Sequence, residues 1–410
     1  MTRGLILNYR DYAPTVGEGL ALTEDGAIIG RSSVGAASSL AAYATVRGDG
    51  EDIRIGGNAW FDQHATVHIA DQIRGSVIGN DVTVARYGVV HACTLDDGVV
   101  VGESAVVMDG AHVGAYAVIA ADSVVPPRKD LPGGYLYSGH PAKPVRRISV
   151  AEARDMAADV RRGRLDEELV SSHLPSWDLV VEPLRAVPGG TLRSLHGRSP
   201  RIVNAFVAST AIVAGDVEMH DESSVFFGCA VCAGDGRIVI GARTNVQDNC
   251  ILATDAARGE LILGEGVTIG HNVQLGSGTI GDDALIGMGS RVGDGDVVEQ
   301  GACIGAGAWV EPGTIVPAGW IWAGRPARAF VLRRYWLSWR DLDRLSKMRL
   351  TRPQMMPPRI APITTEIGIS TGTLFASHHA SVAPPTMPPS TEKIAPLRRK
   401  NAPICSMILL

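Results

Sequence analysis

Apolar residues recur every six positions along two long stretches of the chain. The first series is Leu95, Val101, Val107, Val113, Ile119 and Val125, and the second is Ile280, Ile286, Val292, Val298, Ile304, Val310 and Val316. A helix with 3.6 residues per turn does not repeat every six residues, and an alternating strand repeats every two. Six residues instead form one side of a triangular coil, with a short strand, one inward apolar residue and a turn. The pattern therefore predicts parallel β-helices built from hexapeptide repeats.

The same features occur twice along the chain, 185 residues apart. The motif Gly139-His-Pro-Ala-Lys143 returns as Gly324-Arg-Pro-Ala-Arg328. The six-residue spacing is also broken once in each copy, at corresponding places, where two inward residues are only five apart: Val90 and Leu95, and Leu275 and Ile280. A shared irregularity indicates a tandem duplication more strongly than a shared regularity does. The sequence thus predicts two β-helices packed side by side.

The remaining segments predict helices, a linker and a tail. Ser149 and Glu152 form a capping box before an apolar stripe of Val150, Ala153, Ala157 and Val160. We therefore expect an all-β fold with flanking helices: two tandem left-handed parallel β-helices, each followed by an α-helix. The expected parts are a first β-helix at 1–148, a helix and linker at 149–197, a second β-helix at 198–330, a helix at 331–350 and a disordered tail rich in Pro, Ser and Thr at 351–410.

Composition narrows the class of protein. The formal net charge of −5, without a basic stripe, argues against a nucleic-acid partner. No run of 18 apolar residues predicts a membrane span, and the first residues lack the features of a signal peptide. Six cysteines in 410 residues are too few for a disulfide framework. A cytoplasmic location is the resulting expectation.

The second copy resembles the γ-class carbonic anhydrases. The resemblance rests on Thr244-Asn-Val-Gln-Asp-Asn249, Val267-Thr-Ile-Gly-His271 and Leu285-Ile-Gly-Met-Gly289. The first copy carries Arg47-Gly-Asp49 and the closing Gly-x-Pro-Ala-Lys motif of the same family. Members of this family form trimers of coils, with zinc held at each interface by three histidines. Two of these ligands come from one coil and the middle ligand comes from its neighbour.

Carried onto this chain, the resemblance gives one complete set of metal ligands divided between the two copies. The first ligand position holds His68 or Ala253, the second Arg86 or His271, and the third His91 or Gly276. Neither copy alone has the three protein ligands that a catalytic zinc site requires. Together, His68 and His91 from one coil and His271 from the other supply them. We weigh this composite site against a decayed scaffold that has lost its histidines.

The resemblance also suggests roles for residues around the metal. Asn245 and Gln247 would orient substrate, and Asp71 is a weak candidate for moving the proton. Arg47 and Asp49, with Asp235 at the matching place in the second copy, would hold the subunit interface through ion pairs. Arg86 would face a third coil and replace the charge of a metal there.

The implied activity is that of a carbonate dehydratase-like lyase, which hydrates carbon dioxide to bicarbonate with zinc, or with iron or cobalt, since three imidazoles suit all three metals. Two alternatives stay open: a non-catalytic assembly subunit, and an acyl-CoA transferase or thioesterase that uses His91 without metal. Because the chain supplies two coils, we also expect a homo-oligomer or a hetero-assembly with a third γ-class coil.

Overall fold

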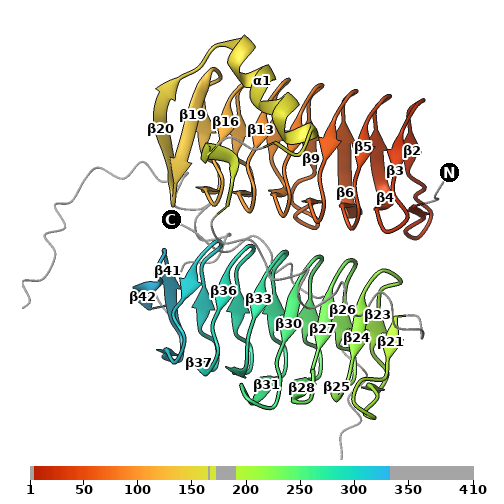
Figure 1. Cartoon of the computed structure of the whole chain (residues 1–410), viewed down its shortest axis with the longest axis vertical. Coiled ribbons are helices and arrows are strands. Elements are labelled where there is room, and N and C mark those ends of the chain that lie inside the picture. Colours follow the sequence, from red (N-terminus) through yellow and green to blue (C-terminus); the bar gives the residue numbers. More distant parts are fainter. Residues whose placement is uncertain (1–3, 165–166, 172–190, 333–410) are drawn as a thin grey trace, which may run out of the picture. The chain divides into compact units, whose positions relative to one another are not determined.

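The short strands of the chain form two successive coils (Figure 1). The computed structural model describes residues 4–164, 167–171 and 191–332. The first coil runs from strand β1 to strand β20, and the second runs from β21 to β42. Each coil is a left-handed parallel β-helix with three faces, which the chain visits in the order face 1, face 2, face 3. The fold class expected from the six-residue period is confirmed, with one α-helix among the described residues.

The first coil stacks short strands on each of its faces. Face 1 contains β3 (Ala21–Leu22), β5 (Ser39–Leu40), β7 (Trp60–Phe61), β10 (Thr83–Val84), β13 (Val100–Val101), β16 (Val118–Ile119) and β19 (Tyr135–Gly139), closed by the antiparallel β20 (Ala142–Arg147). Strands β4 (Ala27–Val34) and β6 (Thr45–Ile55) bend across faces 2 and 3. Face 2 adds β1 (Leu5–Leu7), β8 (Thr66–His68), β11 (Val89–His91), β14 (Val106–Val107) and β17 (Val124–Val125). Face 3 adds β2 (Thr15–Val16), β9 (Ser76–Ile78), β12 (Thr94–Leu95), β15 (His112–Val113) and β18 (Asp130–Leu131).

The second coil repeats this arrangement. Face 1 contains β23 (Phe206–Val207), β26 (Ser224–Val225), β29 (Asn245–Val246), β32 (Thr268–Ile269), β35 (Leu285–Ile286), β38 (Cys303–Ile304) and β41 (Trp320–Ala323), closed by β42 (Arg328–Leu332). Face 2 contains β21 (Leu192–Arg193), β24 (Ile212–Ala214), β27 (Ala230–Cys232), β30 (Ile251–Ala253), β33 (Gln274–Leu275), β36 (Arg291–Val292) and β39 (Trp309–Val310). Face 3 contains β22 (Arg201–Ile202), β25 (Val217–Met219), β28 (Arg237–Ile240), β31 (Glu260–Leu263), β34 (Gly278–Ile280), β37 (Asp296–Val298) and β40 (Ile315–Val316).

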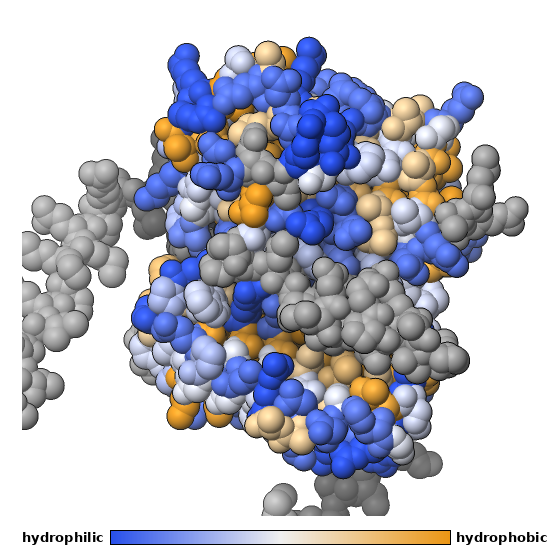
Figure 2. Space-filling view, viewed as in Figure 1, coloured by the Kyte–Doolittle hydropathy of each residue, from blue (hydrophilic) through white to orange (hydrophobic). Residues whose placement is uncertain are grey.

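The apolar residues of both six-residue series fill the two coil interiors. Every member of the two series is at most 5% exposed. The sequence offset of 185 is also a structural offset, because β8, for example, corresponds to β30 and β11 corresponds to β33. The surface outside these cores is mostly hydrophilic in the view of Figure 2.

Helix α1 (Val150–Arg161) begins at the predicted cap and covers face 1 of the first coil. The Ser149 hydroxyl accepts a hydrogen bond from the backbone N–H of Glu152. Ala153, Met156 and Val160 are its buried residues. The expected apolar stripe was wrong at Val150, which is 44% exposed, because Met156 rather than the first residue of the helix packs against the coil. A short 3-10 helix, η1 (Glu167–Leu169), follows.

The expected bounds of the linker and of the second helix differ from those in the structure, and the expected tail lies outside the described residues. Strand β21 pairs with β24, so sheet structure begins within the segment expected to be linker. Strand β42 reaches Leu332, where the second helix was expected to have begun. The rest of that expected helix and the tail at 351–410 lie outside the described residues. No described helix has the length and apolar character needed to cross a membrane.

The coils meet where the turns between faces 1 and 2 of each coil approach face 2 of the other. The turn positions are left-handed, with φ between 55° and 67°, and we call them the corner columns: Tyr43, His64, Tyr87, Ser104 and Asp122 in the first coil, and Gly228, Asn249, Asn272, Gly289 and Gly307 in the second. A Cβ at Gly289 would lie 2.8 Å from Val106, and a Cβ at Gly307 would lie 2.5 Å from Val124. Glycine therefore allows the close approach of the coils.

Asparagine side chains of the second corner column hold the first coil. Asn249 Nδ2 donates to Thr66 Oγ1 at 2.9 Å, and Asn272 Nδ2 donates to the His64 carbonyl at 2.9 Å. The His64 ring is stacked between Tyr43 and Tyr87, with ring centroids 4.8 Å apart on both sides. These contacts fix the coils in one register along their length.

An exposed histidine on face 3 of the first coil gives a pH-dependent contact. His112 Nε2 lies 3.0 Å from Asp96, and its Nδ1 lies 2.8 Å from Asp130. Burial tends to lower the pKa of His112, but the hydrogen bonds to Asp130 and Asp96 outweigh it and raise this pKa. A raised folded pKa stabilises the fold at pH values below the unfolded pKa of about 6.5, and the effect is lost as pH rises through the folded pKa.

We therefore expect the His112 ring to titrate above pH 6.5 in an NMR experiment. In Asp96→Asn the midpoint should fall, because one of the two carboxylates is gone. Because the site is exposed, the effect on stability should stay within about 0.5 kcal/mol. An unchanged midpoint in Asp96→Asn would contradict the ion pairs.

Candidate metal centre

Three histidine side chains from the two coils converge on one point. His68 ends β8 and His91 ends β11, and the two residues are direct neighbours in the strand register. His271 comes from a turn of the second coil, between β32 and β33. His68 Nδ1 lies 3.2 Å from His91 Nε2 and 3.1 Å from His271 Nε2. The ligand nitrogens all lie within 4.8 Å of one another, and the three rings are buried.

The outer nitrogen of each ring faces a carboxylate. His68 Nε2 lies 2.9 Å from Asp49 Oδ1, and His91 Nδ1 lies 2.5 Å from Asp109 Oδ1. His271 Nδ1 lies 3.2 Å from Asp248 Oδ2, within ion-pairing distance but not aligned for a hydrogen bond. A carboxylate behind an imidazole fixes which ring nitrogen holds the proton. The outer nitrogens are thus the protonated ones, and the inner nitrogens present lone pairs.

Burial keeps the imidazoles of His68 and His271 neutral. It lowers the pKa of His68 to about 3, with a further contribution from the Arg47 charge. It likewise lowers the pKa of His271 to about 4, although Asp248 opposes the shift. Neutral imidazole is the form that binds metal.

This donor set fits a metal ion. The inner lone pair of His68 faces those of His91 and His271 at 3.1–3.2 Å, and such lone pairs repel without a cation between them. Nitrogens about 2.0–2.1 Å from a tetrahedral zinc would be separated by about 3.3–3.4 Å, close to the observed spacings. Three protein ligands leave a fourth position open. His68, His91 and His271 are therefore the residues that would hold the ion.

Arg47 links the carboxylates on either side of the contact between the coils. It is 3% exposed and pairs with Asp49 in its own coil. Its Nε donates to Asp248 Oδ2 in the second coil at 2.9 Å. The guanidinium carbon lies 4.5 Å from the centroid of the Phe226 ring. Burial tends to raise the pKa of Asp248, but Arg47 and His271 outweigh it and lower this pKa to about 2.

The polar pair expected to orient substrate lies behind Arg47. Gln247 Oε1 accepts a hydrogen bond from Arg47 Nη2 at 2.5 Å. Gln247 Nε2 in turn donates to Asn245 Oδ1 at 2.8 Å. Asn245 Nδ2 donates to Thr268 at 3.1 Å. Both side chains thus belong to the network that surrounds the histidines.

The other residues expected at the site have polar partners other than the three histidines. Asp71 is exposed, and its carboxylate accepts a hydrogen bond from Gln72. Arg86 pairs with the buried Glu103 of its own coil at 2.6 Å. The interface role of Asp235 stays a prediction, and within the chain its exposed carboxylate accepts the backbone N–H of Ala256 at 2.7 Å. The second coil has Ala233 where an arginine would be needed to pair with it.

Asp109 was not anticipated from the sequence, although a signal existed. The five-residue side between Val90 and Leu95 shortens this turn of the coil to 17 residues, so that Val90 pairs with Val107. The residue one turn after His91 is therefore Met108, and Asp109 follows it in the bend after β14, within reach of the ring. Asp248 carries a comparable signal, since it precedes Asn249 in the motif already singled out.

Several known proteins are similar to part of the chain. No protein-family model matches the chain. The chain is 37% identical over 152 residues to "Gamma carbonic anhydrase 2, mitochondrial" of Arabidopsis thaliana, which covers 36% of this chain and 55% of that protein. It is 31% identical over 150 residues to "Protein YrdA" of Escherichia coli, which covers 35% of this chain and 82% of that protein. The chain therefore spans about half the length of the first of these relatives and most of the second.

A solved structure is also similar. The hexapeptide transferase family protein of Anaplasma phagocytophilum is 34% identical, with 38% of this chain and 91% of that chain covered and a TM-score of 0.34. Each matched region in the curated relatives is about the length of one coil. With its two hexapeptide-repeat coils and its relatives of this class, the chain belongs to the γ-class carbonic anhydrase family.

Proposed function

We propose that this protein is a metal-dependent lyase that hydrates carbon dioxide to bicarbonate, with one metal site shared between its two coils. The observation that carries the proposal is the convergence of His68, His91 and His271, whose ligand nitrogens all lie within 4.8 Å of one another. Each coil lacks at least one of the three ligands. Ala253, Arg86 and Gly276 occupy the corresponding positions in the other copy.

A metal ion held by the three histidines would supply the hydroxide for hydration, and neighbouring residues of the chain orient the histidine rings. A zinc ion with three imidazole ligands supplies hydroxide at neutral pH, because it lowers the pKa of a bound water to about 7. Iron and cobalt also accept three imidazoles. Asp49, Asp109 and Asp248 orient the rings and keep the inner nitrogens deprotonated. Met108, which is buried, follows β14 beside His91 and provides an apolar wall suited to carbon dioxide.

Residues beyond the ligands would handle substrate and proton. Gln247 and Asn245 form a hydrogen-bonded pair held by Arg47, which suits them to orient a small polar reactant. The exposed position of Asp71 would let its carboxylate exchange protons with solvent. These roles are part of the proposal.

The two alternative functions make different use of the same residues. An acyl-transfer enzyme would need the His91–Asp109 pair as a base, but His91 is fully buried and its Nε2 points at His68. That geometry argues against direct contact with an acyl substrate. A silent assembly subunit would have no need for three carboxylates behind three histidines. Cytoplasmic location and recruitment of a third coil stay predictions.

Metal content and activity should be measured on the same purified sample. We expect one zinc, iron or cobalt ion per chain and measurable carbon dioxide hydration by stopped flow. Removal of the metal by a chelator should abolish hydration, and adding the metal back should restore it. At 100-fold excess over its dissociation constant, the metal should stabilise the fold by about 2.7 kcal/mol, seen as a higher unfolding temperature.

The metal content and the hydration rate distinguish the lyase from the two alternative functions. Stoichiometric metal without hydration would indicate an assembly subunit with a structural ion. Turnover of an acyl-CoA substrate by the metal-free protein would indicate the acyl-transfer alternative.

A further inference from the structure

Face 2 of the second coil has small residues where the first coil has two histidines of the candidate metal centre. Ala253 and Gly276 stand at the positions of His68 and His91, as the 185-residue offset shows. Residues this small leave space on the face. A pocket with a volume of about 200 Å³ lies there, and Ala253 and Gly276 are among its lining residues. The position equivalent to the metal centre is therefore open rather than filled by imidazole rings.

The residues around this pocket are polar or aromatic where those of the first coil are aliphatic. Gln274, Arg291 and Trp309 stand where the first coil has three valines, which are buried against the second coil. Arg258 and Asp294 complete the charged part of the lining. The pocket is therefore lined by two guanidinium groups and one carboxylate.

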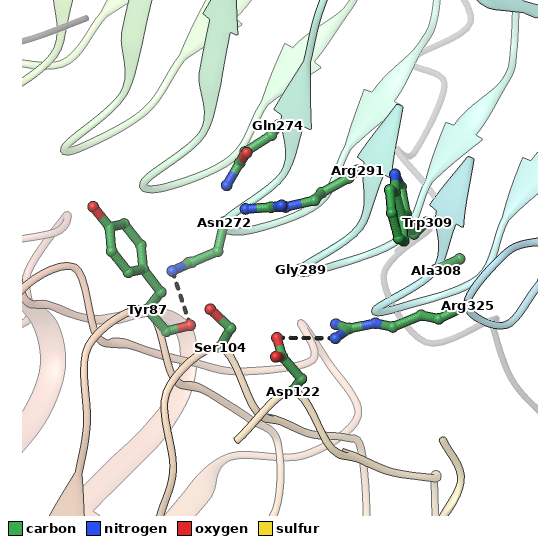
Figure 3. A pocket seen from close by; sticks show the side chains of 10 residues that line it. All are labelled: Tyr87, Ser104, Asp122, Asn272, Gln274, Gly289, Arg291, Ala308, Trp309 and Arg325. Carbon is green, nitrogen blue, oxygen red and sulfur yellow. Dashed lines mark hydrogen bonds and ion pairs between the residues drawn. The ribbon is translucent and has the colours of Figure 1, made fainter. Parts of the chain in front are cut away.

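A second, smaller pocket adjoins the first and lies between the two coils (Figure 3). Gln274, Arg291 and Trp309 line both pockets. The smaller pocket has a volume of about 20 Å³, room for about one water molecule. Figure 3 shows Arg325 at its other side, in an ion pair of 2.9 Å with Asp122 of the first coil. This lining also contains two guanidinium groups and one carboxylate.

Arg291 is the cation common to both pockets, and its surroundings favour an anion. Burial lowers the pKa of Arg291, because the charged guanidinium is less well hydrated there. Asp122 opposes this shift, and the positive charge of Arg325 adds to it. An anion near both guanidinium groups would offset the loss of hydration and the repulsion between them. His140, beside Arg325, adds no charge at neutral pH, since burial and Arg325 lower its pKa to about 4.

The donors and the size of the pockets suit a small oxyanion. A guanidinium group presents its N–H donors in one plane and can bind two oxygens of an anion at once. Gln274 and Ser104 add a side-chain amide and a hydroxyl to the lining. The larger pocket, at about 200 Å³, is below the roughly 300 Å³ at which pockets for drug-sized molecules begin. The ligand therefore has only a few atoms besides its charged oxygens.

We propose that these adjoining pockets bind one small oxyanion, of the size of bicarbonate or sulfate, on Arg291 with Arg325 beside it. The second copy, which lacks two of the metal ligands, thus keeps a binding site at the equivalent place, for an anion instead of a metal ion. The site lies on face 2 of the second coil, whereas two of the three histidines lie on face 2 of the first. The proposal does not depend on the metal or on the proposed activity.

Thermal unfolding of the full chain in different salts tests the proposal. Sodium bicarbonate and sodium sulfate are the probes, and sodium chloride at the same ionic strength is the reference. Each oxyanion should raise the unfolding temperature above that in chloride, because a ligand that binds the folded state stabilises it. Arg291→Gln should weaken the binding at least about tenfold, since hydrogen bonds from a charged donor are lost. An effect of bicarbonate without one of sulfate would identify a planar oxyanion, and an effect of both would identify oxyanions in general.

Three further variants separate this site from damage to the fold and from the metal centre. Gln274→Glu keeps the size of the side chain and should also weaken binding, because its carboxylate would repel the anion and compete for Arg291. Arg243→Gln removes an exposed arginine from its pair with Glu265 and should bind as the natural chain does. His271→Ala should still bind the oxyanion, so that failure of the metal centre and failure of this site are distinguishable.

Two results would overturn the proposal. One is that bicarbonate and sulfate stabilise the natural chain no more than chloride does. The other is that folded Arg291→Gln and Gln274→Glu bind the oxyanion as tightly as the natural chain.

Discussion

Replacing His271 by alanine is expected to remove the bound metal and abolish carbon dioxide hydration. His271 is the one ligand that the second coil contributes, and two imidazoles are too few for a tetrahedral site of this kind. Metal content should fall from one ion per chain to near zero after gel filtration. The hydration rate should fall at least about a hundredfold, equivalent to about 2.7 kcal/mol of transition-state stabilisation. Elemental analysis and stopped-flow kinetics on the same sample measure both effects.

Alanine substitutions of the two histidines of the first coil provide the comparison with His271→Ala. His68→Ala and His91→Ala should lose metal and activity to the same extent, because all three rings point at one centre. His112→Ala removes an exposed histidine from another face of the coil and should leave both unchanged. Full metal content in His271→Ala would show that the second coil is only a scaffold.

The fold could be predicted because its signal is repeated many times. Each six-residue side carries one inward apolar residue, and thirteen such residues in two series all proved buried. The shared five-residue break at Leu95 and Ile280 marked the duplication, and the strands on either side of it correspond one to one. Because so many repeats carry the same signal, the fold would still be predicted if one inward residue were polar.

The site could be predicted only in part, because its details depend on how the coils meet. The sequence offset indicates which positions are equivalent, but not which surface of one coil touches which surface of the other. Asp235 illustrates this, since an equivalent aspartate without its arginine became a turn residue. Asp109 shows the opposite case, because its role depends on His91 in the adjacent turn of the coil, 18 residues away in the sequence.

The segment that joins the coils was the least predictable feature. Residues 167–171 have no periodicity, and they are held by backbone N–H groups of Glu103 and Ala121 that any sequence would offer.

Replacing Arg47 by alanine is expected to destabilise the contact between the coils more than any change at an exposed charge. Arg47 is buried and pairs with Asp49 and with the fully buried Asp248. Its removal leaves carboxylates in a buried position without their cation, which costs about 3–5 kcal/mol. The midpoint of chemical denaturation should fall accordingly. The measurement is best made on metal-free protein, so that loss of the metal does not contribute.

A control variant and the pH dependence of stability show why Arg47→Ala lowers the stability of the protein. Arg54→Ala removes an arginine from an exposed pair with Asp52 and should change stability by no more than about 0.5 kcal/mol. Arg47 lowers the pKa of Asp248 to about 2 against the opposing effect of burial. A lowered folded pKa contributes stability above the unfolded value of about 3.9, and the contribution is lost as pH falls through the folded pKa. The difference between the natural chain and Arg47→Ala should therefore be largest near neutral pH and narrow in acid. A pH-independent difference would mean that lost packing on Phe226, rather than charge, explains the effect.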